Sequence, residues 1–437
     1  MTVAEVMPRL LLALPLAIAV CRAGGAAARR LGQPPVVGEI AVGVLIGPSL
    51  LGGERSDAQS YLLPPTVLNH IEVLGQVGLL TFMFLTGLTL DLRHLRGHGR
   101  AAVAVSQAGI LVPLLLGGSL GLALYGPLAP EGVERSTFTL FVAVAMSITA
   151  FPVLARILTD RGLYQSPLGS LAMACAAVDD ITAWCLLALV VAVSRGGTPL
   201  DSLTAAALVL LYAAVMLRLV RPLLEKALRS RPAPVVLVWL FCGMCLSSVV
   251  TDMIGVHALF GAFTFGVVTP RGSETVEKAV GALRSVVVPL LLPLFFLVAG
   301  LHADVGVLAA DPAQWLWLGA ILIVALAGKW GGAAAAARLS GLPWRQALAL
   351  GALMNCRGLT ELIVLTVGLD LGVISRELFT MLVLMALLTT AITSPAVAAF
   401  GYGSHPRNRS TGTTSTPCDT PEEVGEPPLP DDTIRSG

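Results

Sequence analysis

Charged residues are scarce in this 437-residue chain, and their scarcity excludes an ordinary water-soluble fold. Asp, Glu, Lys and Arg together make up 13% of the sequence, about half of the share that soluble domains carry. Hydrophobic residues reach 55%, and the mean hydropathy is +0.82. Most of the molecule must therefore contact the lipid bilayer instead of water.

The chain also lacks a surplus of charge of one sign and a metal-binding pattern of cysteines. Its formal net charge is +1, and no basic face stands out, so nucleic acid is not an expected partner. The seven cysteines are scattered, mostly through apolar stretches, where they serve as small hydrophobic residues. Cys242 and Cys245 form a C-x-x-C pattern, but no second pair or histidine cluster accompanies it. We therefore expect no cofactor and no metal beyond a transported cation.

Apolar stretches long enough to cross a bilayer recur almost from end to end of the chain. A spanning helix needs roughly 20 such residues. By this criterion the sequence predicts about thirteen spans, near 7–27, 35–52, 68–90, 101–126, 136–158, 167–194, 199–220, 233–252, 254–269, 284–302, 314–338, 345–368 and 376–400. Residues 1–402 are expected to form one all-α integral membrane domain.

Lysine and arginine are distributed unevenly between the loops. Loops that follow odd-numbered spans hold about eighteen of them, against about five in the other loops. Because cytoplasmic loops of cell-membrane proteins retain positive charge, this asymmetry predicts an external N-terminus and a cytoplasmic C-terminus. The tail 403–437 is rich in Ser, Thr, Pro and acidic residues, so we expect a disordered cytoplasmic extension.

The sixth predicted span carries two adjacent carboxylates, Asp179 and Asp180, near its middle. An ionisable side chain at membrane depth costs at least about 2.5 kcal/mol, so each one needs a structural or functional reason. Neighbouring helical residues point about 100° apart, which would place both carboxylates along adjacent sides of one cavity. A carboxylate can take either a small hard cation or a proton. The pair is therefore the expected cation and proton site.

The fifth predicted span contains a second signal, the run from Ser147 to Pro152. A proline in mid-helix removes a backbone hydrogen bond and disfavours helix at the residue before it, so we expect the span to break here. Ser147 and Thr149 could then offer hydroxyl or carbonyl oxygens to an ion. Simple hydrogen bonding between helices is the alternative for Ser147.

The twelfth predicted span contains a matching signal, in which Asn355, Arg357 and Gly358 precede Glu361. Interrupted segments at corresponding positions of two halves indicate the binding site of a transporter. The two breaks lie seven spans apart, an odd number, so the halves are expected to be inverted in the membrane. Arg357 and Glu361 have the signs that neutralise the local helix dipoles, which favours a structural role for both over direct cation binding.

Lys329 lies in the middle of the eleventh predicted span, beside Gly328 and Gly331. Small residues let another helix approach closely, and a buried ammonium requires a carboxylate partner. Asp179 or Asp180 is the expected partner. Glu39, at the start of the second span, could be a helix-start acid or an entrance ligand, and the first interpretation is favoured.

Taken together and in order, these motifs resemble the cation/proton exchanger domain of the monovalent cation:proton antiporter-2 family. The resemblance covers roughly residues 7–400. It is carried by Gly38-Glu39-Ile40 before Gly47-Pro48-Ser49, the break from Ser147 to Pro152, Val178-Asp179-Asp180-Ile181, Lys329 in its glycine-rich span, and the run from Met354 to Glu361.

The resemblance implies a thirteen-helix Na⁺/H⁺ antiporter fold of two inverted repeats, with a dimerisation domain and a core domain. It implies that two discontinuous helices cross near the aspartates, that the core moves like an elevator, and that the protein is a homodimer. By position, Asp180 matches the ion-binding acid of the family, Asp179 the more variable residue before it, and Lys329 the lysine that pairs with that variable acid.

Two features bear on the mechanism that the resemblance implies. Many relatives carry Asn or Gln at the position of Asp179, and an acid there points to electrogenic exchange of sodium for protons. Other features resemble plant-like exchangers, so sodium and potassium both stay open. A potassium efflux system of the same family is one alternative. From another class, an intramembrane aspartyl enzyme could use two aspartates, although such enzymes place them on different helices.

Overall fold

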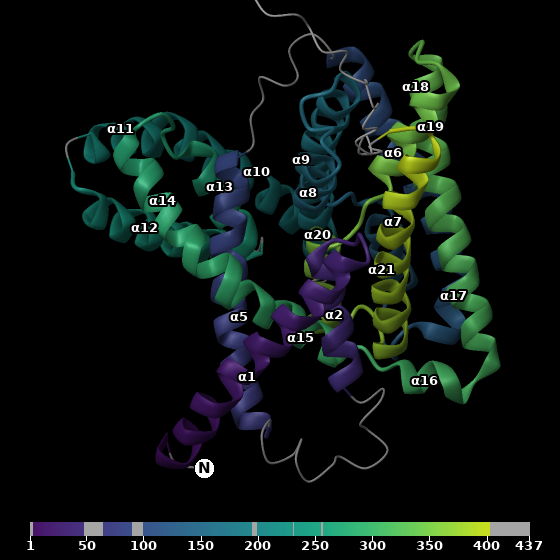
Figure 1. The fold of residues 1–437 in the computed structure, drawn as a ribbon, viewed down its shortest axis with the longest axis horizontal. Helices are drawn as coiled ribbons and strands as arrows, with labels where there is room; N and C mark the ends of the chain where they lie inside the picture. Colours follow the sequence, from purple (N-terminus) through teal and green to yellow (C-terminus); the bar gives the residue numbers. More distant parts are fainter. Residues whose placement is uncertain are drawn as a thin grey trace, which may run out of the picture. The chain divides into compact units, whose positions relative to one another are not determined.

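A computed structural model describes residues 3–47, 64–89, 99–194, 199–229, 231–254 and 257–402, and Figure 1 shows the ribbon. The tail 403–437 and the end of the second predicted span, 48–52, lie outside the described residues. The disorder expected for the tail therefore stays a prediction. Within the described ranges every regular element is a helix.

The helices follow the apolar stretches of the sequence. In chain order they are α1 (Val3–Arg30), α2 (Pro35–Ile46), α5 (Pro65–Thr89), α6 (Gly99–Leu128), α7 (Arg135–Ser147), α8 (Phe151–Asp160), α9 (Pro167–Ser194), α10 (Pro199–Val215), α11 (Arg221–Leu228), α12 (Ala233–Ile254), α13 (Ala258–Val268), α14 (Glu274–Val286), α15 (Leu292–His302), α16 (Val305–Ala310), α17 (Pro312–Ala325), α18 (Gly332–Leu339), α19 (Trp344–Met354), α20 (Leu359–Asp370) and α21 (Arg376–Ala399). Three π-helical segments join consecutive helices: Met216–Val220, Val287–Leu291 and Leu326–Gly331. In the described part of the chain, nine stretches are long and apolar enough to cross a membrane.

Each predicted span coincides with a described helix or with two helices that follow directly on one another. Two boundaries were predicted wrongly. The seventh span extends to Leu228 instead of ending near residue 220, and the tenth begins at Glu274 instead of near residue 284. In the second case Val276 and Ala279 remain buried while charged residues occupy the other face, so an amphipathic helix continues beyond the apolar window that defined the prediction.

The described helices sort into two lobes with sparse contacts between them (Figure 1). The flanking lobe contains α1, α2, α5 and α10 to α15, and the broken-helix lobe contains α6 to α9 and α16 to α21. Contacts between the lobes include those of α9 with α10 and of α2 with α21. Gln33, between α1 and α2, also donates to the carbonyl of Ala391 on α21 at 3.2 Å.

Helix contacts recur with an offset of seven spans, as expected for two repeats. In the first half α1 packs on α2, and in the second half α12 packs on α13. Helix α2 packs on α15, and α13, the counterpart of α2 in the second half, packs on α5. In the same way, the packing of α6 on α7 corresponds to that of α18 on α19. Since an odd number of crossings separates the partners, each pair runs in opposite directions across the membrane, which makes the repeats inverted.

Glycines mark the equivalent contacts in both repeats. A Cβ added to Gly43 would lie 2.5 Å from the backbone of α15, and one added to Gly300 would lie 2.5 Å from the backbone of α2. Gly87 of α5 lies against the backbone of α13, and Gly266 of α13 lies against the backbone of α5. Small residues at such crossings allow helices to approach closely without hydrophobic driving force from lipid.

Candidate functional site

Both expected helix breaks are present in the broken-helix lobe. Helix α7 ends at Ser147, and α8 begins at Phe151 with Pro152 in its first turn, where the missing N–H costs nothing. Helix α19 ends at Met354, and α20 begins at Leu359 after Gly358. Gly358 has φ 156° and ψ −120°, a conformation that residues with a Cβ avoid. Proline and glycine thus create the two interruptions.

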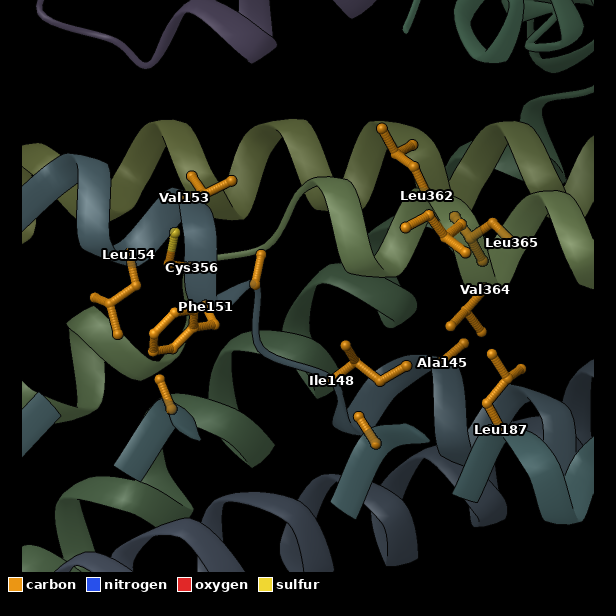
Figure 2. Close-up of a cluster of buried hydrophobic side chains, with 14 of the residues drawn as sticks. Ala145, Ile148, Phe151, Val153, Leu154, Leu187, Cys356, Leu362, Val364 and Leu365 are labelled. Carbon is orange, nitrogen blue, oxygen red and sulfur yellow. The ribbon is translucent and has the colours of Figure 1, made fainter. Parts of the chain in front are cut away.

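The two interrupted segments meet and bond each other. The N–H of Ala150, the residue before α8, donates to the carbonyl of Cys356 at 2.9 Å. The hydroxyl of Thr149 contacts the carbonyl of Met354, the last residue of α19, at 3.0 Å. Apolar side chains enclose the crossing, with Phe151 and Cys356 on one side of it (Figure 2). The Ala150 N–H and the Cys356 carbonyl, which the breaks would leave unbonded in lipid, therefore satisfy each other across the two broken spans.

Arg357 binds the end of the other broken helix, and the local assignment made from the sequence is wrong in this respect. Its guanidinium donates to the carbonyls of Ala145 at 3.0 Å and Met146 at 2.5 Å, both in the last turn of α7. It also donates to Glu361 Oε1 at 2.8 Å. The positive charge therefore compensates the negative end of α7 instead of that of α19, while Glu361 does lie in the first turn of α20.

Asp179 accepts hydrogen bonds from three separate elements. Its Oδ1 accepts from the hydroxyl of Ser106 on α6. Its Oδ2 accepts from the Thr149 hydroxyl at 2.6 Å and from Lys329 Nζ at 2.8 Å. Both partners of the Lys329 ion pair are fully buried. A buried carboxylate that accepts this many hydrogen bonds is fixed in position.

Lys329 lies in the π-helical segment between α17 and α18, and it connects Asp179 to the first break. Its ammonium group donates a second hydrogen bond, at 2.5 Å, to the carbonyl of Ser147, the last residue of α7. The Ser147 hydroxyl instead bonds Val144 within its own helix. Such π-helical turns often occur at functional sites. The end of α7 thus faces two buried cations, Lys329 and Arg357.

Asp180 is also buried, at 1% exposure, one residue beyond Asp179 on α9. Five buried charged side chains of the described chain belong to the broken-helix lobe: Asp179, Asp180, Lys329, Arg357 and Glu361. Three are carboxylates and two are cations, so one carboxylate is in excess when all are ionised. A buried excess charge is costly, and either one proton or one monovalent cation would neutralise it.

Asn355 caps the end of α19 and is buried at 1% exposure. Among described residues its side-chain oxygen has no hydrogen-bond partner, so this acceptor is available at the crossing. Sequence reasoning missed Ser106 on α6 and Thr390 on α21. The Thr390 hydroxyl accepts a hydrogen bond from the backbone N–H of Arg357 at 2.9 Å. A hydroxyl in an apolar span was the available signal, but many such residues bond only their own helix.

Glu39 is not a helix-start acid, contrary to the favoured prediction. It is the fifth residue of α2, with 6% of its surface exposed. It lines a cavity of about 330 Å³ together with Arg22, Arg29 and Arg156. The alternative interpretation, a residue at an entrance, agrees better with this position.

Comparisons with known proteins extend over most of the chain. Residues 16–400 match a sequence profile described as "Sodium/hydrogen exchanger, transmembrane". The chain is 40% identical over 374 residues to the Na(+)/H(+) antiporter NhaS4 of Synechocystis sp., covering 84% of this chain and 91% of that protein. It is 38% identical to cation/H(+) antiporter 17 of Arabidopsis thaliana, over 90% of this chain and 48% of that protein. Identity to K(+)/H(+) antiporter 1 of Saccharomyces cerevisiae is 35%, over 83% and 43% respectively.

The chain thus spans about half the length, or less, of these plant and yeast relatives. Among solved structures, that of the sodium proton antiporter MjNhaP1 from Methanocaldococcus jannaschii at pH 8 superposes with a TM-score of 0.57. The sequences are 15% identical, and the match covers 91% of this chain and 98% of that one. This likeness concerns the fold alone.

Proposed function

The chain belongs to the sodium/hydrogen exchanger family, and on that premise we propose that it exchanges a monovalent cation for protons across the cell membrane. The observation that carries the proposal is the buried charge cluster at the crossing of the broken helices. The broken-helix lobe buries three carboxylates and two cations among the described residues. Lys329 and Arg357 bond the end of α7, and Asp180 follows Asp179 on α9. One proton or one monovalent cation restores neutrality, so the two compete for the cluster.

Asp180 is the proposed shared site. Asp179 accepts hydrogen bonds from Ser106, Thr149 and Lys329, so we propose that it is the fixed partner of the lysine. Asp180 supplies a second hard oxygen ligand beside it, suited to a small cation when ionised and to a proton otherwise. Thr149 and the buried Asn355 oxygen lie at the same crossing and offer further oxygens.

Transport is proposed to be electrogenic, with two protons exchanged for one cation. Two carboxylates and one lysine share the site, so Asp180 can exchange its proton for the cation while the pair Asp179 and Lys329 carries a second proton. Moving one charge through 100 mV is worth about 2.3 kcal/mol, so an imposed voltage should shift the exchange equilibrium more than tenfold. Equal cation distributions at every voltage would refute the stoichiometry.

Sodium and potassium are both candidate substrates, because the relatives named above are a Na(+)/H(+), a cation/H(+) and a K(+)/H(+) antiporter. Everted membrane vesicles from cells that express the full chain test this directly. Addition of sodium, potassium or lithium in turn should collapse a preformed pH gradient for at least one cation. Vesicles that keep their gradient with all three would contradict the proposal. Downhill potassium release without proton movement would favour the efflux alternative.

A transporter is favoured over an intramembrane aspartyl enzyme by the placement of the acids. Both aspartates lie on α9, and one of them is bonded to Lys329. Paired catalytic aspartates instead face each other and share a proton. Absence of peptidase activity is therefore part of the proposal.

The orientation and the oligomeric state are further parts of the proposal. The excess of arginine and lysine after odd-numbered spans supports an external N-terminus and a cytoplasmic C-terminus. A homodimer is proposed from the family resemblance, with the flanking lobe as the dimerisation domain. Cross-linking in native membranes tests the dimer, and a purely monomeric product would contradict it.

A further inference from the structure

A cavity of about 330 Å³ lies between the two lobes on the side of the arginine-rich loops. From the flanking lobe, α1, α2, α5 and the segment from Val288 to Phe296 line it, and α8 lines it from the broken-helix lobe. The described part of α9 with the two aspartates does not contribute to its lining. This space is therefore distinct from the buried charge cluster.

Positive charge dominates the cavity, although the protein is proposed to carry cations. Arg22 and Arg29 lie seven residues apart on one face of α1, and Arg156 faces them from α8. Glu39 is the one acidic residue among the described residues of the lining. It packs against α1 at Gly25, where an added Cβ would lie 3.1 Å from its Oε1. The described lining thus contains three guanidinium groups and one carboxylate.

The first turn of α2 adds to this positive field. Pro34, Pro35 and Val36 line the cavity, and Pro34 caps the helix without a side-chain hydrogen bond. Helix N-termini carry partial positive charge, so they attract anions. In this turn Pro35 has no N–H and the Val37 N–H donates to the Pro34 carbonyl at 3.1 Å, so the helix dipole is the main contribution. The helix end and the arginines come from different elements, yet they face the same space.

The remaining lining is apolar and includes Phe82, Val153, Leu292 and Phe296. A ligand that fits this cavity therefore has a compact anionic group that can lie next to apolar side chains. We propose that the cavity binds a phosphate-bearing anion, supplied either as the headgroup of an acidic phospholipid or as a soluble phosphate. Guanidinium groups suit phosphate because they offer paired donors in a planar fork.

Binding here has a consequence for transport, and this part rests on the proposed function. The anion would contact Arg22 and Arg29 on one lobe and Arg156 on the other. A ligand that binds one arrangement of the lobes better than another shifts the population toward it. Phosphate binding should therefore hold the lobes as they are seen here and slow exchange.

Binding can be measured without transport, on the full chain purified in neutral detergent. Thermal stability is recorded against increasing phosphatidylglycerol, phosphatidylcholine or inorganic phosphate at constant ionic strength, because a ligand of the folded state raises the melting temperature. We expect stabilisation by phosphatidylglycerol, with an apparent affinity that falls roughly fivefold for each arginine removed. The variants are Arg22→Gln, Arg29→Gln and Arg156→Gln.

Two further variants separate a specific site from general charge attraction. Arg231→Gln removes an exposed arginine that is outside the cavity lining, and it should retain wild-type affinity. Glu39→Gln removes the opposing charge and should raise the affinity. Stabilisation by inorganic phosphate alone would assign a soluble ligand, and stabilisation by phosphatidylglycerol alone would assign the lipid headgroup.

The proposal is overturned if neither phosphatidylglycerol nor inorganic phosphate stabilises the wild type, or if the three cavity variants bind as tightly as the wild type does. An equal loss in Arg231→Gln, or weaker binding in Glu39→Gln, would also overturn it. These measurements report ligand binding only, so their outcome does not depend on whether the protein exchanges cations. Exchange rates in vesicles with and without phosphatidylglycerol then test the regulatory consequence.

Discussion

The ion pair of Arg357 with Glu361 gives the most quantitative prediction, because both side chains are fully buried and the bond is 2.8 Å long. Arg357→Leu leaves the Glu361 carboxylate buried without its partner. Removing one member of a buried ion pair costs about 3–5 kcal/mol. The carbonyls of Ala145 and Met146 also lose their donor, which adds about 1 kcal/mol or more for each. The single variant should therefore lose at least about 5 kcal/mol.

The double variant Arg357→Leu with Glu361→Leu should be more stable than Arg357→Leu alone. The second substitution removes the unpaired buried charge and replaces it with an apolar side chain, which buried ion pairs often tolerate. The cost of the two unbonded carbonyls remains, at about 2 kcal/mol in total. The double-mutant cycle should thus show strong coupling of the two residues.

Thermal unfolding in detergent at a fixed scan rate measures this cycle. Arg221 and Glu225 provide a matched control, since they have the same spacing but are 56% and 48% exposed, with a distance of 3.4 Å. Breaking that pair should cost less than about 1 kcal/mol. The reasoning is refuted if Arg357→Leu is as mild as Arg221→Leu, or if the two buried substitutions destabilise additively.

Three further predictions concern the lysine, the second helix break and the topology. Lys329→Ala and Asp179→Asn should each lower the melting temperature and should couple in a double-mutant cycle, because their side chains bond at 2.8 Å; additive losses would show that they act separately. Gly358→Ala should destabilise by about 1–3 kcal/mol, since its backbone conformation is strained for alanine, whereas Gly281→Ala in α14, with open space around the new methyl, should not destabilise. A reporter fused after residue 402 should be cytoplasmic and one before residue 6 external, and a periplasmic C-terminus would contradict the orientation.

Local chemistry made the helix breaks and the partner of Lys329 predictable from the sequence. Pro152 and Gly358 constrain the backbone by their own geometry, so they indicate interruptions without knowledge of neighbours. Lys329 is buried by the length of its apolar span, and a buried ammonium needs a carboxylate. The structure places Lys329 against Asp179. The roles of these residues in transport stay predictions.

Contacts between distant elements were beyond sequence reasoning. Arg357 was assigned to its own span, but its guanidinium reaches α7, over 200 positions earlier. The crossing of two broken helices, which decides that contact, is a tertiary feature. Ser106 was missed because one serine in an apolar helix usually bonds its own backbone. Glu39 was misassigned because the arginines around it come from α1 and α8. Its position in the sequence and the residues next to it do not show that these helices lie close to it.

The central claim is that the buried carboxylate cluster exchanges one monovalent cation for protons, with Asp180 as the shared site. Its most direct test is proton flux in proteoliposomes that contain the purified protein, with a pH-sensitive dye inside and sodium or potassium added outside. We predict cation-dependent proton movement for the wild type and none for Asp180→Asn, which should insert and fold because an amide fits the same space without charge. Retained exchange in Asp180→Asn, with either cation, would contradict the claim.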